Sequence, residues 1–393
     1  MPFAISRGAR LYWRQDGAAD KPALVLLTSI GTDLSLYDPV VPLLTPDFRV
    51  IRLDTRGHGA SDAPAGDYSL DLLADDVLAV MDAAGADKAS LCGTSLGGMI
   101  AMTLAAKAPE RVEALVLACT SPAMDPAVWN QRLALIRAEG MGAIVEAVMG
   151  RFFSDAFRAQ HPEIVETVRA GMLAQSVDGY AGCGAAIRDM ALLDRLSAIV
   201  APTLVVTGAK DLATPFEGHG QHIVAAVAGA RHIEIGGAHL PSLEAPTALA
   251  GAVRDFVREV RRGTAVREAK DTLFEAGLET RRKVLGDAWV DKSLAKRTAF
   301  TADYQAMITR YAWNEIWGRP GLDHRTRRLL VLAICASLAR WEEFRLHVRA
   351  GLEQGGFTQD ELKEVLMQTA IYAGVPAANT AFTEAAEVIA ELG

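Results

Sequence analysis

Residues 91–100 read LCGTSLGGMI, and this stretch decides the fold of the first two-thirds of the chain. It contains the pattern G-x-S-x-G around Ser95, directly after an apolar run and directly before a segment with helical spacing. A serine in a sharp strand-to-helix turn projects its hydroxyl outward, while the flanking glycines let neighbouring backbone pack closely. The motif therefore predicts a nucleophilic serine. The alternative is a glycine-rich turn with an incidental serine, which the strand and helix on either side disfavour.

Apolar or β-branched runs that do not alternate with polar residues are typical of buried parallel strands. Four such runs precede residue 120, at residues 23–27, 49–53, 89–92 and 114–118. The strand pattern resumes at residues 203–206 and 231–235. Helical spacing at residues 71–84 and 97–108 separates some of these runs. Strands that alternate with helices predict an α/β fold with a doubly wound, mostly parallel sheet.

Two long segments lack convincing strands. Residues from about 122 to 195 have helical patterns and interrupt the strand series, so we expect a helical lid over the carboxyl edge of the sheet, where ligands bind in open α/β sheets. After Arg262 and Gly263 the chain is helical to its end. The sequence thus predicts an α/β domain over residues 1–262 and an all-helical domain over residues 263–393.

Ser95 needs a base, and the base needs an acid that holds it in the correct tautomer. In folds with this motif the order along the chain is serine, acid, histidine. Asp211 and His239 each follow an expected strand, so both should lie at the same sheet edge as Ser95. His58 lies in an early turn with a structural role. Three further histidines are expected to be surface or packing residues, namely His219, His222 and His232.

A tetrahedral intermediate requires two preorganised N–H donors for its oxyanion. We expect one from the backbone of Leu96, directly after the nucleophile. The other should come from the loop after residues 23–27, with Ile30 as the best candidate.

Residues 1–262 resemble the α/β-hydrolase superfamily, and within it the 3-oxoadipate enol-lactonase branch. The resemblance is carried by TSIGTDLSLYDPV (28–40), LDTRGHGASD (53–62), GTSLGGMIA (93–101) and GAHLPSLEAP (237–246). It implies hydrolysis of a small lactone that bears a free carboxylate. Trp129 and Arg132, which share a helical face in the lid, are candidates for binding that carboxylate, although packing is the commoner role of a lid tryptophan.

Residues from about 263 resemble the carboxymuconolactone decarboxylase family, which is all-helical and usually oligomeric. The resemblance is carried by VLGDAWVDKS (284–293), RYAWNEIWGRPGLD (310–323), LHVRAGLEQGG (346–356) and YAGVPAANTAF (372–382). Peroxidase-linked members of that family have a Cys-x-x-Cys pair before the histidine. This chain has none there, so the resemblance implies decarboxylation without redox chemistry and without a cofactor.

The resemblance indicates His347 for acid–base work, with Glu343 four residues earlier to orient the imidazole; a solvated pair is the alternative. Arg327 or Arg328 could hold carboxylates, because a guanidinium binds them with two hydrogen bonds. Trp313 and Glu315 are expected to shape the pocket.

The formal net charge of −8 argues against a nucleic-acid partner. Residues 329–339 form the longest apolar stretch and are too few to cross a bilayer as a helix. They are apolar on nearly every side, which predicts a homo-oligomer assembled through the helical domain. Residues 1–17 lack the apolar run of a signal peptide, so we expect none, and the four scattered cysteines indicate no metal site. These features suggest a cytoplasmic protein.

Together the two resemblances imply a bifunctional enzyme of protocatechuate breakdown, because the product of the second family is the substrate of the first. Two alternatives remain. One is a monofunctional esterase or C–C hydrolase with a non-catalytic helical oligomerisation domain. The other is a catalytically inactive, ligand-binding hydrolase fold.

Overall fold

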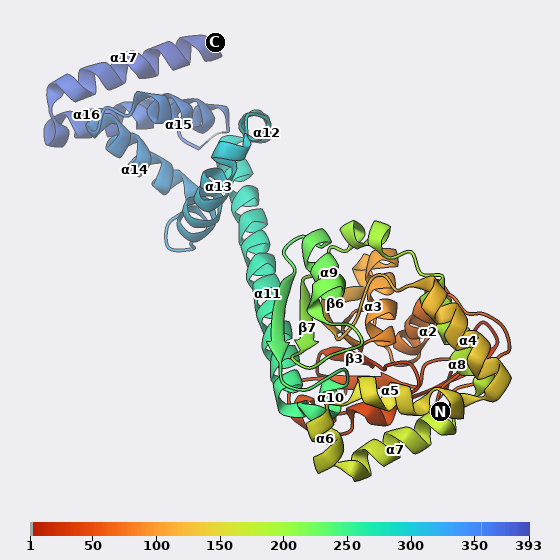
Figure 1. Cartoon of the computed structure of the whole chain (residues 1–393). Helices are drawn as coiled ribbons and strands as arrows, with labels where there is room; N and C mark the ends of the chain where they lie inside the picture. The colour runs from red at the N-terminus through yellow and green to blue at the C-terminus, as the bar shows by residue number, and fades with distance from the viewer. Residues whose placement is uncertain (1–2, 355) are drawn as a thin grey trace. The chain divides into compact units, whose positions relative to one another are not determined.

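The computed structural model describes residues 3–354 and 356–393, and the chain divides into two compact units, Met1–Arg262 and Gly263–Gly393. Figure 1 traces both units in colour from red to blue. Within the described residues, none of the helices combines the length and the apolar character that a membrane crossing requires.

The N-terminal unit is built on one eight-stranded sheet with the strand order β1-β2-β4-β3-β5-β6-β7-β8. Strands β3 to β8 pair in parallel, and the β1–β2 and β2–β4 pairings are antiparallel. The strands are β1 (Phe3–Ser6), β2 (Ala9–Asp16), β3 (Ala23–Leu27), β4 (Arg49–Leu53), β5 (Ala89–Thr94), β6 (Val112–Ala118), β7 (Thr203–Gly208) and β8 (Arg231–Ile235). The expected α/β fold with a mostly parallel sheet is confirmed. The antiparallel β1 and β2 were not predicted.

The central strands are buried because helices cover the sheet, and every residue of β3 and β5 is buried. The elements that follow β3 and precede β6 are η1 (Leu34–Tyr37), α1 (Val41–Leu44), α2 (Leu70–Ala83), α3 (Leu96–Lys107) and η2 (Pro109–Arg111). Helix α3 lies directly behind the turn at Ser95 and is buried over almost its whole length. The helix that carries the nucleophile is therefore part of the core.

Between β6 and β7 the described chain is helical, as Figure 1 shows in yellow and yellow-green for α4–α8. The helices are α4 (Pro126–Glu139), η3 (Met141–Ala143), α5 (Val145–Phe152), α6 (Asp155–Gln160), α7 (Pro162–Leu173), α8 (Val177–Arg188) and η4 (Leu193–Ala198). Strand β7 leads through η5 (Phe216–Gly220) and α9 (Gln221–Ala226) to β8, and α10 (Pro241–Glu244) follows. The carboxyl ends of β5, β7 and β8 therefore lead directly into the three loops that contain Ser95, Asp211 and His239.

Helix α11 (Pro246–Leu285) begins in the N-terminal unit and ends in the C-terminal unit. The remaining elements of the C-terminal unit are all helical, as the sequence predicts. They are α12 (Asp287–Ala295), α13 (Ala299–Ile308), the π-helical η6 (Thr309–Trp317), α14 (His324–Ser337), α15 (Trp341–Glu353), α16 (Gln359–Ala373) and α17 (Val375–Leu392). At the start of α16, Thr358 and Glu361 form a capping box.

The C-terminal unit has two small apolar clusters in place of one large core. One cluster joins α14, α15, α16 and α17 around Leu332, Phe344 and Leu366. The other surrounds Trp313 and Trp317 and includes Val284 at the end of α11. A unit of this size with divided cores leaves much apolar surface uncovered, and the exposed side chains of Leu330, Ile334 and Leu338 on α14 are part of that surface.

Candidate active sites

Ser95 lies between β5 and α3 with φ 56° and ψ −116°, a backbone conformation that non-glycine residues rarely adopt. Its carbonyl accepts hydrogen bonds from the Thr120 hydroxyl at 2.6 Å and from the Gly98 N–H at 2.9 Å, and these contacts hold the strained turn in place. A Cβ on Gly93 would lie 2.2 Å from the Gly97 carbonyl oxygen, and one on Gly97 would lie 2.2 Å from the Leu27 carbonyl oxygen. Both glycines of the motif are therefore required by close backbone approach.

Asp211 and His239 form a buried pair. Nδ1 of His239 lies 3.1 Å from each carboxylate oxygen of Asp211. The carboxylate also accepts hydrogen bonds from the N–H groups of Ala213 and Thr214 and from the Thr214 hydroxyl. Burial alone raises the pKa of Asp211, but the imidazole and these donors outweigh burial and hold that pKa well below its usual value. Asp211 is therefore charged at neutral pH and fixes His239 with its Nε2 directed away.

Ser95 and His239 line one cavity of about 70 Å³. Among the described residues no hydrogen bond joins their side chains, and such contacts are often long in free enzymes and shorten when substrate binds. The lid contributes to the imidazole environment through Phe152, whose ring stacks on His239 with centroids 5.5 Å apart. The three residues predicted from the sequence thus converge on one site.

Of the two expected oxyanion donors, Leu96 directly follows Ser95 and Ile30 lines this cavity. Leu96 is the first residue of α3, so its N–H has no acceptor within the helix and lies at the positive end of the helix dipole. Ile30 lines the cavity opposite, in the loop after β3. The next residue, Gly31, donates its N–H to Nε2 of His58 at 2.9 Å. Burial lowers the pKa of His58 to about 4, so the ring is neutral at pH 7 and can accept this bond, which anchors the loop.

Two lid arginines line the Ser95 cavity. Arg132 on α4 lies over the ring of Trp129, 4.7 Å from its centroid, and both residues line the cavity. Arg151, on α5 one residue before Phe152, lines it as well and was not predicted. The sequence signal for Arg151 was weak, because a single basic residue near the end of a short amphipathic helix is common on protein surfaces.

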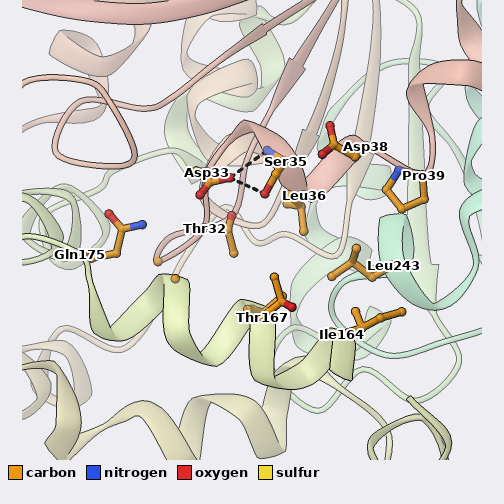
Figure 2. A pocket seen from close by; sticks show the side chains of 13 residues that line it. Thr32, Asp33, Ser35, Leu36, Asp38, Pro39, Ile164, Thr167, Gln175 and Leu243 are labelled. Atoms are coloured by element: carbon orange, nitrogen blue, oxygen red, sulfur yellow. Dashed lines mark hydrogen bonds between the residues drawn. The ribbon is translucent and has the colours of Figure 1, made fainter. Parts of the chain in front are cut away.

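A second, larger cavity of about 410 Å³ separates lid helix α7 from the loop after β3. Figure 2 shows Thr167 and Ile164 of α7 facing Thr32, Asp33 and other side chains of this loop and of η1. The cavity contains none of the three catalytic candidates, but Gly31 lines it while the adjacent Ile30 lines the Ser95 cavity. Helix α7 thus leaves open space beside this loop, while Met172 of α7 lies close to Gly31.

The C-terminal unit places only some of the expected residues together. His347 is 7% exposed, and its ring stacks on Trp317 with centroids 5.7 Å apart and planes 2° apart. Trp317 in turn stacks on Trp313 at 5.4 Å. Burial, reinforced by the charge of Arg328, lowers the pKa of His347 to about 4. His347 is therefore a neutral, buried imidazole beside two tryptophans and an arginine.

Three expectations for this unit fail within the described chain. Glu343 is exposed and makes no hydrogen bond to His347 there, because α15 turns His347 inward and Glu343 outward. Glu315 is also exposed, with Nδ2 of Asn314 as a neighbour at 3.3 Å. Arg327 donates to the backbone carbonyls of Leu322 and Arg319. Helical spacing alone did not show which face of each helix is buried.

Arg328 is 3% exposed, and one nitrogen donates to the Val284 carbonyl. Sequence reasoning missed Arg281 on α11, which is 8% exposed and lies over the rings of Trp289 and Trp313. Its neighbour Arg282 faces the solvent. In the sequence, only the spacing of Arg281 from the apolar residues Val284 and Leu285 on α11 could have indicated that Arg281 is buried.

Comparison with known proteins finds a matching family for each of the two units. Residues 22–246 match the alpha/beta hydrolase fold family, and residues 302–387 match the carboxymuconolactone decarboxylase family. The chain is 34% identical to 3-oxoadipate enol-lactonase 2 of Acinetobacter baylyi over 243 residues, which cover 62% of this chain and 91% of the relative. It is 44% identical to 4-carboxymuconolactone decarboxylase of the same organism over 120 residues, 30% of this chain and 89% of the relative.

A solved structure, the enol-lactonase of Burkholderia xenovorans LB400, is 36% identical and aligns with a TM-score of 0.64 over 65% of this chain and all of that chain. The matches to the two Acinetobacter relatives meet in one polypeptide and cover most of its length. The chain therefore belongs to the alpha/beta hydrolase fold family through its N-terminal unit and to the carboxymuconolactone decarboxylase family through its C-terminal unit.

Proposed function

We propose that this chain catalyses two consecutive steps of the 3-oxoadipate pathway. The C-terminal unit decarboxylates 4-carboxymuconolactone to 3-oxoadipate enol-lactone, and the N-terminal unit hydrolyses that lactone to 3-oxoadipate. The observation that carries the proposal is the presence in one chain of near-complete relatives of both enzymes, an enol-lactonase and a 4-carboxymuconolactone decarboxylase. Because the product of the first reaction is the substrate of the second, the fusion raises the local concentration of the intermediate.

In the lactonase site, Ser95 attacks the lactone carbonyl while His239 accepts the hydroxyl proton. The N–H groups of Leu96 and Ile30 stabilise the resulting oxyanion. His239 then protonates the departing enol oxygen, and water hydrolyses the acyl-enzyme by the same route in reverse. Asp211 supports this role because it holds the Nδ1 side of the imidazole.

The free carboxylate of the enol-lactone requires a cationic partner in a cavity whose other walls are mostly apolar. Arg132 and Arg151 meet this need, since both line the cavity that contains Ser95. Trp129 positions the guanidinium of Arg132 through their stacking contact. These lid residues therefore select lactones that bear a carboxylate.

In the decarboxylase site, the bond between a ring carbon and its carboxylate breaks and CO₂ leaves. The electron pair passes through the ring double bond onto the lactone carbonyl oxygen. A proton then adds to the ring carbon next to that carbonyl. His347 is our candidate for the proton transfer, because it is the buried imidazole of this unit and faces Arg328 and Trp317.

We further propose that the C-terminal unit assembles into a homo-oligomer. A groove of about 670 Å³ lies between α14 and α16 and is lined by Leu329, Leu330, Val365 and Tyr372. Tyr372 is 82% exposed, and Ile334 and Leu338 continue the apolar surface along α14. Apolar patches of this kind mark association surfaces. A second copy of the chain is the expected occupant, and Ile334→Glu should lower the mass measured by light scattering.

The test of function is product identification. The purified chain, incubated with 4-carboxymuconolactone, should release CO₂ and form 3-oxoadipate in equal amounts. A fluorophosphonate should label Ser95 rapidly, which would exclude an inactive ligand-binding fold. Formation of neither product would contradict the proposal. If the chain hydrolysed added enol-lactone but released no CO₂ from 4-carboxymuconolactone, it would be an esterase with a non-catalytic helical unit.

A further inference from the structure

Two buried arginines of the C-terminal unit lack an anionic partner within the described residues. Nε of Arg281 and both Nε and Nη1 of Arg328 are buried without a hydrogen-bond acceptor. The partners that these side chains do have are neutral: the Ser293 hydroxyl for Arg281 and the Val284 carbonyl for Arg328. Burial lowers the pKa of both guanidinium groups, and no carboxylate offsets the effect.

The lack of an acidic partner distinguishes these two arginines from a buried arginine of the N-terminal unit. Arg56 in the N-terminal unit is equally buried, but it forms a salt bridge with Asp76, whose side chain is also buried. A buried charge without a counter-charge costs several kcal/mol of folding free energy. Two such charges in one small unit therefore indicate that an anion completes the site.

The contacts around these arginines form a closed circuit. Arg281 lies over Trp313, and Trp313 stacks on Trp317. Trp317 in turn stacks on His347, whose pKa is lowered by burial and, to a smaller extent, by the charge of Arg328. Arg328 returns to α11 at Val284, which lies one helical turn after Arg281 on the same helix face.

His347 belongs to the same set of incomplete groups, because its Nδ1 is buried without a partner. Two guanidinium groups and a neutral imidazole, all more than nine-tenths buried and all with unused nitrogens, surround one aromatic stack. An apolar ligand would leave these nitrogens unsatisfied. A ligand with two carboxylates would satisfy them.

We propose that Arg281 and Arg328 form a dicarboxylate clamp at the decarboxylase site, with Arg281 binding the carboxylate that the product retains and Arg328 facing the reacting half of the substrate beside His347. This inference rests on the proposed function. The assignment follows from position, since Arg281 is at the opposite end of the aromatic stack from His347. As CO₂ leaves, the negative charge moves onto the lactone carbonyl oxygen, and Arg328 stabilises it there.

The two arginines should therefore fail in different ways when replaced in the full-length chain. Arg281→Gln should raise KM for CO₂ release from 4-carboxymuconolactone about 10- to 100-fold, with kcat changed by less than about threefold. Arg328→Gln should lower kcat by at least about tenfold. The control is Arg282→Gln, because Arg282 is adjacent on α11 but pairs with Asp287 and Asp291 at the surface. Its kinetics should match the wild type.

A binding probe separates the anchor from the chemistry. Muconolactone has the same ring and retained carboxylate but no ring carboxylate, so it cannot be decarboxylated. Its inhibition constant should rise about 10- to 100-fold in Arg281→Gln and stay near the wild-type value in Arg328→Gln. Far-UV circular dichroism of the same variants reports whether the helical C-terminal unit remains folded.

Arg281→Met tests whether the residue merely packs. Loss of an unpaired buried charge should leave the melting temperature of the free protein unchanged or higher. If Arg281→Met lowered the melting temperature and Arg281→Gln kept the wild-type KM, Arg281 would be a packing residue. That result would overturn the clamp. Wild-type protein that binds muconolactone through Arg281 but releases no CO₂ would support the clamp and contradict the proposed function instead.

Discussion

Asp211 in the N-terminal unit and Arg281 in the C-terminal unit are both buried ionisable groups, but their surroundings differ. Every oxygen of the Asp211 carboxylate has a donor from the same chain. Arg281 retains a buried nitrogen without an acceptor. The catalytic Asp211–His239 pair of the lactonase site is therefore compensated within the protein before substrate arrives, whereas we expect the decarboxylase site to depend on the charge of its ligand. This difference predicts that substitutions in the first site impair chemistry and that those in the second also alter binding and stability.

The largest expected effect is in the compensated site. Asp211→Asn should lower kcat for enol-lactone hydrolysis by about 10⁴, because the amide can donate to Nδ1 and favours the wrong tautomer of His239. Steady-state hydrolysis rates measure the effect. Asp38→Asn, at an exposed aspartate that pairs with Arg52, is the matched control and should retain wild-type rates. Equal losses in both variants would argue against a specific role of Asp211.

His347→Gln should lower the rate of CO₂ release by about 10²- to 10⁴-fold, since it removes the proton-transfer group but keeps a polar side chain. Hydrolysis of enol-lactone by the same variant should be unchanged. Glu343→Gln serves as the comparison, because Glu343 is exposed and makes no hydrogen bond to His347 in the described chain. If only Glu343→Gln lost activity, the assignment of the proton-transfer role to His347 would be wrong.

Each unit contains one buried histidine whose pKa is about 4, His58 in the first and His347 in the second. Between pH 6.5 and about 4 the unfolded chain binds a proton at each that the folded chain does not, so stability should fall as pH falls through this window. Each pKa unit corresponds to about 1.4 kcal/mol. Urea unfolding at pH 7 and pH 4.5 measures the loss, which His58→Gln should reduce for the N-terminal unit. A loss that was the same in this variant would show that other groups cause it.

The smallest effect is expected at the rim of the lactonase cavity. Arg151→Gln should raise KM for enol-lactone about tenfold with little change in kcat, because one of two cationic residues remains. Lactonase kinetics measure it, with Arg158→Gln as a control on the adjacent helix α6. An unchanged KM would leave carboxylate recognition to Arg132 alone.

The sequence predicted the central parallel strands well because most of them are short, largely apolar runs. It located Ser95 because steric constraints fix the glycines around it. It did not predict β1 and β2, whose mixed apolar and polar residues suit the antiparallel end of the sheet. Helical spacing identified the C-terminal helices but not their buried faces. The sequence therefore missed Arg281 and wrongly placed Glu343 beside His347. Burial of both positions depends on contacts between helices that are far apart in the chain.

The central claim is that one chain contains two separate active sites. Ser95→Ala incubated with 4-carboxymuconolactone tests it most directly, with CO₂ and organic products followed together. We expect CO₂ release at the wild-type rate and accumulation of 3-oxoadipate enol-lactone, with 3-oxoadipate formed only at the uncatalysed rate. Loss of CO₂ release in a correctly folded Ser95→Ala protein would contradict the claim.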